Sequence, residues 1–170
     1  MTAAPLRCAI PAVPQLSMQT PFGAVTLSEE DGALVALDWG WGRDQEPTPL
    51  LRRARDQLDA YLDGTLRRFD LPLRPAGSAY QRRVWDALAE IPFGEVRTYT
   101  QLAAAAGGSA RSVGQANGLN PLPVIIPCHR VVAARGLGGY TGGEGLDTKR
   151  ALLALEAEAC ARAAGVPACA

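Results

Sequence analysis

A cysteine and the only histidine of the chain stand side by side, at Cys128 and His129, within the sequence IPCHRVV at residues 126–132. The thiolate is the nucleophile in cysteine chemistry, and a neighbouring imidazole can take up the thiol proton near neutral pH. The pair therefore predicts a reactive cysteine with a general base beside it. The alternative is that Cys128 is a small buried hydrophobe and His129 a core residue whose hydrogen bonds are satisfied.

The surroundings of this pair favour the chemical interpretation. Val124, Ile125 and Ile126 form a short apolar run that predicts a strand, and Pro127 ends it. Cys128 would then emerge at the end of a strand, where a reactive side chain can face a cleft.

The composition indicates a folded protein without a metal or a cofactor. The chain has 170 residues, of which 48% are hydrophobic, enough for one large domain or two small ones. Its four cysteines include no CxxC pair and only one histidine accompanies them, so we expect no metal site and reduced thiols. We expect no role in the chemistry for the other three cysteines, Cys8, Cys160 and Cys169. No stretch has the form of a signal peptide or a membrane span, which predicts a soluble cytoplasmic protein without membrane association.

The net charge is zero, which argues against binding nucleic acid by bulk electrostatics. The two halves differ slightly. Residues 1–77 carry 8 arginines against 10 acidic residues, whereas residues 78–156 carry 7 arginines and Lys149 against 6 acidic residues. The sign of this asymmetry favours the C-terminal half as the face for nucleic acid.

The N-terminal half has the pattern of a small β-rich unit. Residues 18–27 and 33–41 are rich in β-formers and flank a turn at residues 29–32, which predicts an antiparallel hairpin. Helical spacing over residues 50–62 predicts a helix, and alternation over residues 69–73 predicts a last strand before a linker at residues 74–77. Trp39 and Trp41 are compatible with a stacking surface for bases, but we interpret them as strand-end residues that cover a small core.

The C-terminal half is predicted to be mainly helical. Ser78, Thr98 and Ser109 are expected to cap helices over residues 80–91, 99–106 and 110–118. The Gly-Gly pair between the last two helices predicts a helix-turn-helix, although an ordinary helical hairpin fits the spacing equally well. A further helix is expected over residues 149–156, followed by an alanine-rich tail that frays from residue 157.

The helix over residues 110–118 is unusual in carrying small side chains around one arginine, Arg111. A backbone with so little bulk can approach a narrow surface such as a DNA minor groove. The alternative is that small residues permit tight packing of helices. The small residues at its start are Ser109, Ala110, Ser112 and Gly114.

A series of motifs in the C-terminal half resembles a known family. The motifs follow one another in order from residue 93 to residue 156. Together they resemble the O6-alkylguanine-DNA alkyltransferases, also called methylated-DNA–protein-cysteine methyltransferases. The matching residues are Phe93-Gly94-Glu95-Val96, Thr98-Tyr99, Ala110-Arg111, Val113-Gly114, Asn120-Pro121, the IPCHRV sequence at 126–131, Tyr140 with Gly142-Gly143, Lys149-Arg150, Leu152-Leu153 and Glu156.

The resemblance implies an α+β fold with two domains. A small β-rich, ribonuclease H-like domain is expected over residues 1–77, and a mainly α domain with a winged helix-turn-helix over residues 78–160, with a flexible tail at residues 161–170. Two departures matter. The histidine and cysteines that bind structural zinc in some relatives are absent, and the chain has no room for the metal-binding phosphotriester domain of others.

The implied activity is direct-reversal DNA repair, in which the alkyl group on O6 of guanine moves irreversibly to Cys128 by an SN2 step, once per molecule. His129 would take the thiol proton through a water, and Glu156 would orient and polarise His129. Asn120 would tie the turn into this network. Tyr99 would hydrogen-bond N3 of the departing guanine and crowd the 3′ phosphate so that the nucleotide rotates out of the stack.

The resemblance also implies how the base and the DNA are held. Backbone carbonyls of Cys128 and Val131 and the N–H of Thr141, after Tyr140, would hold the flipped base. Pro123 would line an alkyl pocket that accepts groups of benzyl size. Arg111 would fill the space left in double-stranded DNA. Tyr99 and the small residues Ser109, Ala110, Ser112 and Gly114 would contact the minor groove.

We expect a monomer, with cooperative binding along DNA left open, and O4-alkylthymine as a second substrate. Two rival functions remain from the residues alone. One is a lesion-binding protein without transfer activity, whose members replace the acceptor cysteine that is present here. The other is a Cys-His-Glu hydrolase, which would turn over repeatedly.

Overall fold

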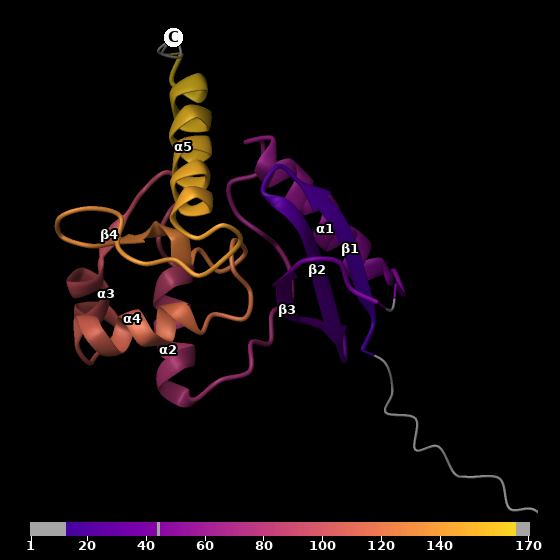
Figure 1. Cartoon of the computed structure of the whole chain (residues 1–170), viewed down its shortest axis with the longest axis horizontal. Coiled ribbons are helices and arrows are strands. Elements are labelled where there is room, and N and C mark those ends of the chain that lie inside the picture. Colours follow the sequence, from indigo (N-terminus) through magenta and orange to yellow (C-terminus); the bar gives the residue numbers. More distant parts are fainter. Residues whose placement is uncertain (1–12, 44, 166–170) are drawn as a thin grey trace, which may run out of the picture.

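The computed structural model describes residues 13–43 and 45–165, which form a three-stranded sheet with one helix and a group of helices beside it (Figure 1). The predictions for Cys8, Cys169 and the end of the tail lie outside the described residues. The fold is α+β, as expected. Within the described residues no helix is both long and apolar enough to cross a bilayer.

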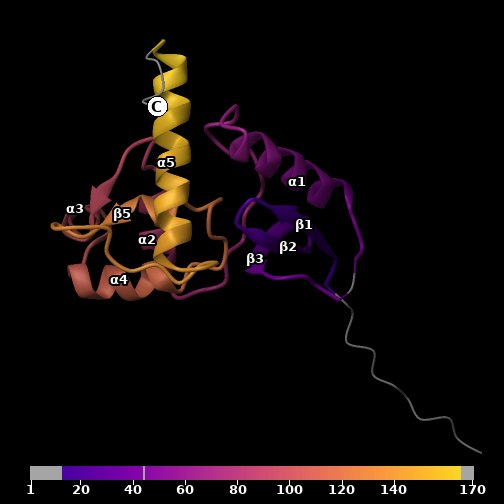
Figure 2. The same cartoon turned by 45° about the horizontal axis from the view of Figure 1, so that its top comes forward.

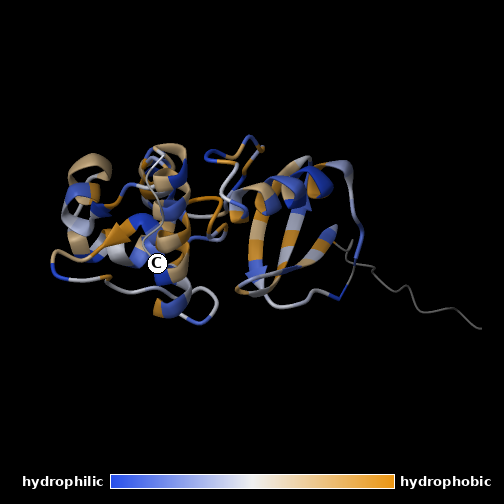
Figure 3. Ribbon diagram, turned by 90° about the horizontal axis from the view of Figure 1, so that it is seen from above, coloured by the Kyte–Doolittle hydropathy of each residue, from blue (hydrophilic) through white to orange (hydrophobic). Residues whose placement is uncertain are grey.

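The sheet is antiparallel, in the order β1 (Gln15–Thr20), β2 (Gly23–Glu30) and β3 (Ala33–Trp39). The single strand predicted over residues 18–27 was wrong, because a turn divides it: the Thr20 hydroxyl accepts from the Phe22 N–H at 3.1 Å and donates to the Gly23 carbonyl at 2.6 Å. The second turn was predicted correctly. Figure 3 shows apolar and polar residues alternating along the strands, as expected for a sheet with one covered face.

Helix α1 (Pro49–Leu62) covers this sheet and contacts β1 and β2 (Figure 2). The Thr48 hydroxyl caps it by accepting from the Leu51 N–H at 3.1 Å. The strand predicted over residues 69–73 was wrong. Only the bridge between Leu34 and Leu73 forms, and Pro72 and Pro75 on either side have no N–H to extend a ladder.

The C-terminal half contains the three predicted helices and their predicted caps, each in a capping box. Gly107 and Gly108 both have positive φ, +85° and +88°, in the tight turn of the helix-turn-helix. Strand β4 (Arg97–Thr98) pairs in parallel with β5 (Val131–Val132). The helices are α2 (Ala79–Ala89), α3 (Tyr99–Ala106) and α4 (Ala110–Gly118).

Two other predictions for this half need correction. Residues 124–126 form a buried turn rather than a strand, with Val124 at a φ of +72°. A short apolar run is ambiguous, because burial alone makes it apolar. Helix α5 (Leu146–Ala163) is longer than expected at both ends, and its Ala159 is only 3% exposed. Residues 157–163 therefore continue the helix instead of forming a frayed tail, and Ala159 is the residue of this stretch that is buried.

One contiguous hydrophobic core joins the two halves. The Leu37 N–H of β3 donates to the Pro121 carbonyl at 2.8 Å, so the edge of the sheet is fixed to the turn before the cysteine. Tyr61 at the end of α1 is fully buried and reaches α5. The sheet thus forms part of the wall around the residues singled out above.

Candidate active site

The segment that carries Cys128 is buried along its whole length from Leu122 to Arg130. The Asn120 side chain holds this turn together: its Nδ2 donates to the Ile126 carbonyl at 2.8 Å, and its Oδ1 accepts from the Leu122 N–H at 3.0 Å. Cys128 then opens a single turn of 3-10 helix, η1 (Cys128–Arg130). The nucleophile is therefore presented by a rigid turn and not by a mobile loop.

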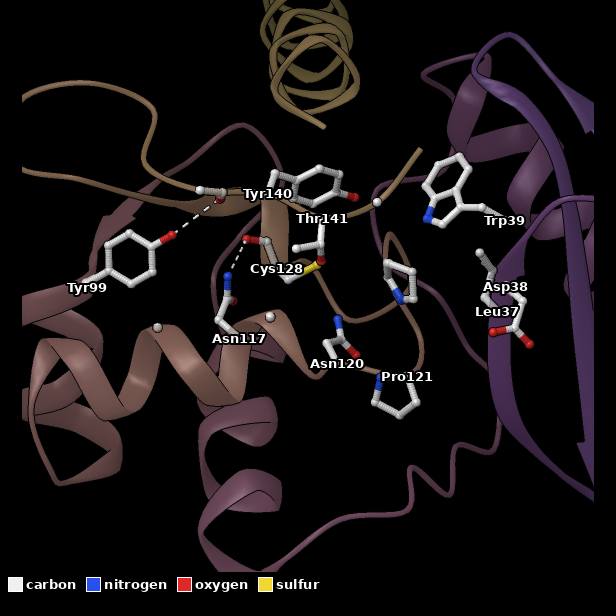
Figure 4. A pocket seen from close by; sticks show the side chains of 15 residues that line it. Leu37, Asp38, Trp39, Tyr99, Asn117, Asn120, Pro121, Cys128, Tyr140 and Thr141 are labelled. Atoms are coloured by element: carbon white, nitrogen blue, oxygen red, sulfur yellow. Dashed lines mark hydrogen bonds between the residues drawn. The ribbon is translucent and has the colours of Figure 1, made fainter. Parts of the chain in front are cut away.

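Cys128 lies in a pocket of about 280 Å³ that is walled by both halves of the chain (Figure 4). Tyr99 and Asn117 stand on one side of the thiol, and Trp39 stands on the other. Of the residues predicted for the base pocket, Pro123, Tyr140 and Thr141 line this cavity. The full lining comprises Leu37, Asp38, Trp39, Tyr99, Gly114, Asn117, Gly118, Asn120, Pro121, Pro123, Cys128, Gly139, Tyr140, Thr141 and Gly142.

Burial raises the pKa of the Cys128 thiol, whose side chain belongs to a residue only 5% exposed. Nearby polar groups of Asn120, of the backbone at Val124 and Cys128, and of Tyr140 act in the opposite direction because they favour the thiolate. Burial has the larger effect. The resting side chain is a neutral thiol, and its use as a nucleophile requires a base.

The base is supplied by a buried network around Glu156. The His129 Nε2 lies 2.7 Å from Glu156 Oε1, and the Arg130 guanidinium donates to both carboxylate oxygens, from Nε at 3.1 and 3.0 Å and from Nη2 at 2.9 Å. The Tyr61 hydroxyl donates to Oε1 at 2.7 Å, and the Gly94 N–H donates to Oε2 at 2.9 Å. Glu156 therefore accepts from four residues.

This network fixes the ionisation of Glu156 and the tautomer of His129. Burial alone would raise the pKa of Glu156, but hydrogen bonds and charge from His129 and Arg130 outweigh it and lower the pKa to about 2. Burial lowers the pKa of His129, so its neutral form is favoured. An ionised carboxylate only accepts, so Nε2 must carry the histidine proton. Nδ1 is left as the basic nitrogen.

Four buried side-chain polar atoms have no hydrogen-bond partner within residues 13–43 and 45–165, and all four belong to this site. Such atoms are uncommon in folded proteins and call for an explanation, a ligand or water among them. His129 Nδ1 is the basic nitrogen just described. The other three belong to pocket residues: Trp39 Nε1, Asn117 Oδ1 and the Tyr140 hydroxyl.

Several residues of the site were missed at the level of sequence, among them Asn117 and Trp39 in the pocket and three residues around it. Tyr61 and Arg130 complete the Glu156 network, and Lys149, which is fully buried, donates to the carbonyls of Val131 at 2.6 Å and Gly139 at 3.0 Å. Burial lowers the pKa of Lys149 to about 8. Arg130 belongs to the IPCHRV sequence at residues 126–131, so a charged residue beside the cysteine was a signal in the sequence. No feature of the sequence around Tyr61 indicated its role.

Tyr61→Phe is expected to lower the free energy of unfolding by about 1–3 kcal/mol, because Glu156 loses a donor in a buried position. The ring of Tyr61, which packs edge-on against Phe93 with centroids 5.8 Å apart, is retained in this variant. Urea unfolding of both proteins measures the difference. An unchanged midpoint and slope would show that the hydroxyl contributes nothing to the network.

Val131 is buried but does not line the pocket. Its carbonyl already accepts from Lys149, and the Cys128 carbonyl accepts from Asn117 Nδ2 at 3.3 Å. The Cys128 carbonyl also accepts from the Val131 N–H, so its two lone pairs are both engaged and a base would have to displace one of these donors. The Tyr99 hydroxyl donates to the Gly139 carbonyl at 3.4 Å, a long and weak bond that a better acceptor can replace.

The residues predicted to contact DNA lie at the start of α4. Ser109, Ala110 and Arg111 are exposed, and Ser112 and Gly114 are half-buried. Ser109 and Ser112 also form hydrogen bonds that stabilise the fold. Ser109 Oγ accepts from the Ser112 N–H at 3.2 Å as the helix cap, and Ser112 Oγ lies 2.8 Å from the Tyr80 hydroxyl.

Comparison with known proteins extends these observations to nearly the whole chain. Residues 16–75 match the family model described as the ribonuclease-like domain of 6-O-methylguanine DNA methyltransferase, and residues 79–158 match its DNA binding domain. The methylated-DNA–protein-cysteine methyltransferase of Mycobacterium bovis is 53% identical over 151 residues, which cover 82% of this chain and 90% of the relative. That of Methanosarcina barkeri is 42% identical over 150 residues, covering 82% and 94%.

Solved structures agree with the sequence relatives. The OGT protein of Mycobacterium tuberculosis in complex with DNA matches with a TM-score of 0.77 and 40% identity over 86% of this chain and 94% of its own. A methyltransferase from Methanococcus jannaschii matches with a TM-score of 0.65 and 28% identity, over 84% and 93%. With both domain models matched and the cysteine site assembled, this chain belongs to the methylated-DNA–protein-cysteine methyltransferase family.

Proposed function

We propose that this protein repairs double-stranded DNA by moving the alkyl group from O6 of guanine to Sγ of Cys128. The observation that carries this proposal is a buried thiol that lines a pocket, served by a histidine whose tautomer an ionised glutamate fixes. The relatives named above are methyltransferases that use a protein cysteine, and one solved relative is bound to DNA. The same site chemistry is assigned to this chain on these grounds.

The proton of the thiol leaves first. His129 Nδ1 is basic and has no partner in the described part of the chain, so it is the acceptor, reached through a bridging water. The imidazolium that forms is stabilised by Glu156, 2.7 Å from Nε2. The thiolate that remains is favoured by the nearby polar groups of Asn120, Val124 and Tyr140.

The thiolate then attacks the alkyl carbon. The S–C bond forms as the C–O6 bond breaks, and the electron pair of that bond goes to the guanine. Guanine leaves as an anion, so a hydrogen bond or a proton from Tyr99 at N3 lowers the barrier. The guanine anion gains one proton in total, counting any proton from Tyr99, and leaves as neutral guanine. Tyr99 lines the pocket and is the residue positioned for this contact.

A base within a duplex cannot reach a buried thiol, so the nucleotide must leave the stack. Arg111 is exposed at the start of α4 and makes no hydrogen bond or ion pair within residues 13–43 and 45–165. We assign it to the space that the flipped base vacates. The small residues around Arg111 bring α4 close to the minor groove, where contacts are mostly to the backbone and give little sequence preference.

Arg111→Ala is expected to slow repair of a fully paired duplex by at least about tenfold, because nothing then fills the gap in the stack. Repair of the same lesion in a single strand should change much less. Rates measured on both substrates give the comparison. Equal losses on the two substrates would assign Arg111 to general DNA affinity instead.

The proposal includes a single turnover, because the thioether on Cys128 is stable and no second cysteine lies beside it in the part of the chain that the structure describes. We also propose that the pocket accepts alkyl groups up to benzyl size, since Pro123 lines it. O4-alkylthymine is proposed as a second substrate. Alkylated Cys128 adds bulk to a packed site, so the product should unfold at a lower temperature than the free protein. The protein acts as a monomer.

Mass spectrometry of the tryptic peptide over residues 112–130 tests the proposal. After incubation with a duplex carrying O6-methylguanine, Cys128 should gain one methylene, and the reaction should stop at one equivalent. DNA binding without modification would assign the chain to lesion recognition without transfer. Continued turnover past one equivalent would assign it to hydrolysis.

A further inference from the structure

Trp39 is a residue of the N-terminal sheet that lines the cysteine pocket. Sequence patterns placed it with Trp41 as a cover for the small core. That interpretation was wrong for Trp41, which is 64% exposed and does not line the pocket. The two tryptophans stand two residues apart but have different surroundings.

Trp39 packs against the backbone of the C-terminal half. A Cβ built on Gly142 would lie 2.8 Å from Trp39 Nε1, and one built on Gly143 would lie 3.3 Å from its Cζ3. The indole therefore rests directly on the backbone that follows Thr141. The strand that carries Trp39 is itself attached to the turn before Cys128 by the hydrogen bond from the Leu37 N–H to the Pro121 carbonyl. The first contact limits movement of the ring, and the second limits movement of its strand.

The position of Trp39 indicates which part of the substrate it meets. Figure 4 shows Tyr99 and Asn117 on one side of Cys128 and Trp39 on the opposite side. Tyr99 is assigned to the guanine ring, so the base occupies its side of the thiol. The reacting carbon lies at the sulfur, and a longer alkyl group has to extend away from the base. That direction leads towards Trp39.

We propose that Trp39 is a specificity-determining residue that limits the size of the alkyl group the pocket accepts. The inference rests on the proposed function, because it takes the pocket to hold O6-alkylguanine. The rigid Trp39 ring, at the end of the pocket away from the base, presents no steric barrier to the transfer of a methyl group. Longer groups meet it, and close-packed protein walls yield little without strain.

A series of duplexes carrying O6-methyl-, O6-ethyl-, O6-propyl-, O6-butyl- and O6-benzylguanine tests the proposal. The readout is the ratio of the transfer rate in Trp39→Ala to that in the wild type, for each adduct. Intrinsic reactivity of the alkyl carbon cancels in this ratio. We expect the ratio to be lowest for methyl and to rise with length, to on the order of 10-fold above the methyl value for the largest groups.

Trp41→Ala is the matched control, since it removes the same side chain from a position outside the pocket, and its ratio should stay flat. A flat ratio in Trp39→Ala would overturn the proposal. A ratio that falls with size would overturn it too, because Trp39 would then assist large groups. Absence of methyl transfer in the wild type would instead reject the proposed function itself.

A second variant guards against poor folding. Trp39→Leu keeps part of the apolar contact and removes the indole N–H, which is buried without an acceptor. Its methyl transfer rate reports whether the fold is intact. Leucine is smaller than tryptophan but larger than alanine, so the ratio should rise with adduct length less steeply than in Trp39→Ala. The same flat profile in both variants would overturn the proposal.

Discussion

Cys128→Ser lowers the rate of alkyl transfer by more than about 10³-fold while the chain keeps its fold and its affinity for DNA. A serine hydroxyl fits where the thiol stood, so packing changes little. Neutral His129 cannot generate an alkoxide, whose proton is far more tightly held than that of a thiol. Hydrogen bonds that support a thiolate in this pocket are insufficient for the harder, more basic oxygen.

The measurement is the mass of the peptide over residues 112–130 after incubation with methylated duplex, together with a binding isotherm for the same duplex. Cys160→Ser serves as the control. Cys160 lies partly buried on α5, with Sγ 4.0 Å from the Phe93 carbonyl, and takes no part in the pocket. Full methylation of Cys160→Ser beside none in Cys128→Ser is the expected pair of results. A methylated Cys128→Ser protein would place the acceptor elsewhere.

Glu156→Gln is expected to lower the free energy of unfolding by about 3–5 kcal/mol and the transfer rate by about 10²- to 10⁴-fold. The carboxylate is 1% exposed, and the Arg130 side chain that pairs with it is 7% exposed. Removing the negative charge leaves the guanidinium buried without a counterion. An amide also presents N–H groups where His129, Arg130 and Tyr61 need acceptors.

Stability and rate are separated by a second substitution. In the double variant Glu156→Gln with Arg130→Met, neither charge is buried, so most of the lost stability should return. The transfer rate should stay low, because His129 still lacks its ionised partner. Denaturant unfolding and single-turnover kinetics give the two quantities. Recovery of both together would mean that Glu156 serves packing alone.

The difference in the free energy of unfolding between the wild type and Glu156→Gln should depend on pH. The pKa of Glu156 is about 2 in the folded chain and has an ordinary value of 4.5. A lowered pKa means that its stabilising contribution is complete above pH 4.5 and disappears as pH falls through about 2. The stability difference between wild type and Glu156→Gln should therefore shrink as pH is lowered over this range. A difference that is constant from pH 7 to pH 2 would contradict the assignment.

Local signals predicted the elements that depend on local contacts. Ser78, Thr98 and Ser109 cap the three helices for which they were proposed, because a cap needs only a hydroxyl and the N–H groups three residues on. The turn at Gly107 was readable for the same reason. The strand at residues 124–126 was mispredicted because an apolar run reports burial and not conformation.

The network around Glu156 shows what local signals omit. Tyr61 and Glu156 are separated by 95 positions, and only the tertiary fold, which brings the end of α1 to α5, places the hydroxyl on the carboxylate. The role of Glu156 itself was expected from a resemblance to a family, since a carboxylate on a helix has no local mark of burial. Trp39 was read as a cover for the core because nothing in its own strand indicates the pocket on the other half.

The four unpartnered polar atoms have a consequence for attempts to engineer this protein. Each of them costs folding free energy until something in the site meets it. Variants selected only for resistance to heat would therefore accumulate replacements at Trp39, Asn117 and Tyr140, where an apolar side chain removes the cost. Those variants would gain thermal stability but lose specificity for the alkyl group. A selection for stability should therefore also measure repair of lesions with alkyl groups of increasing size.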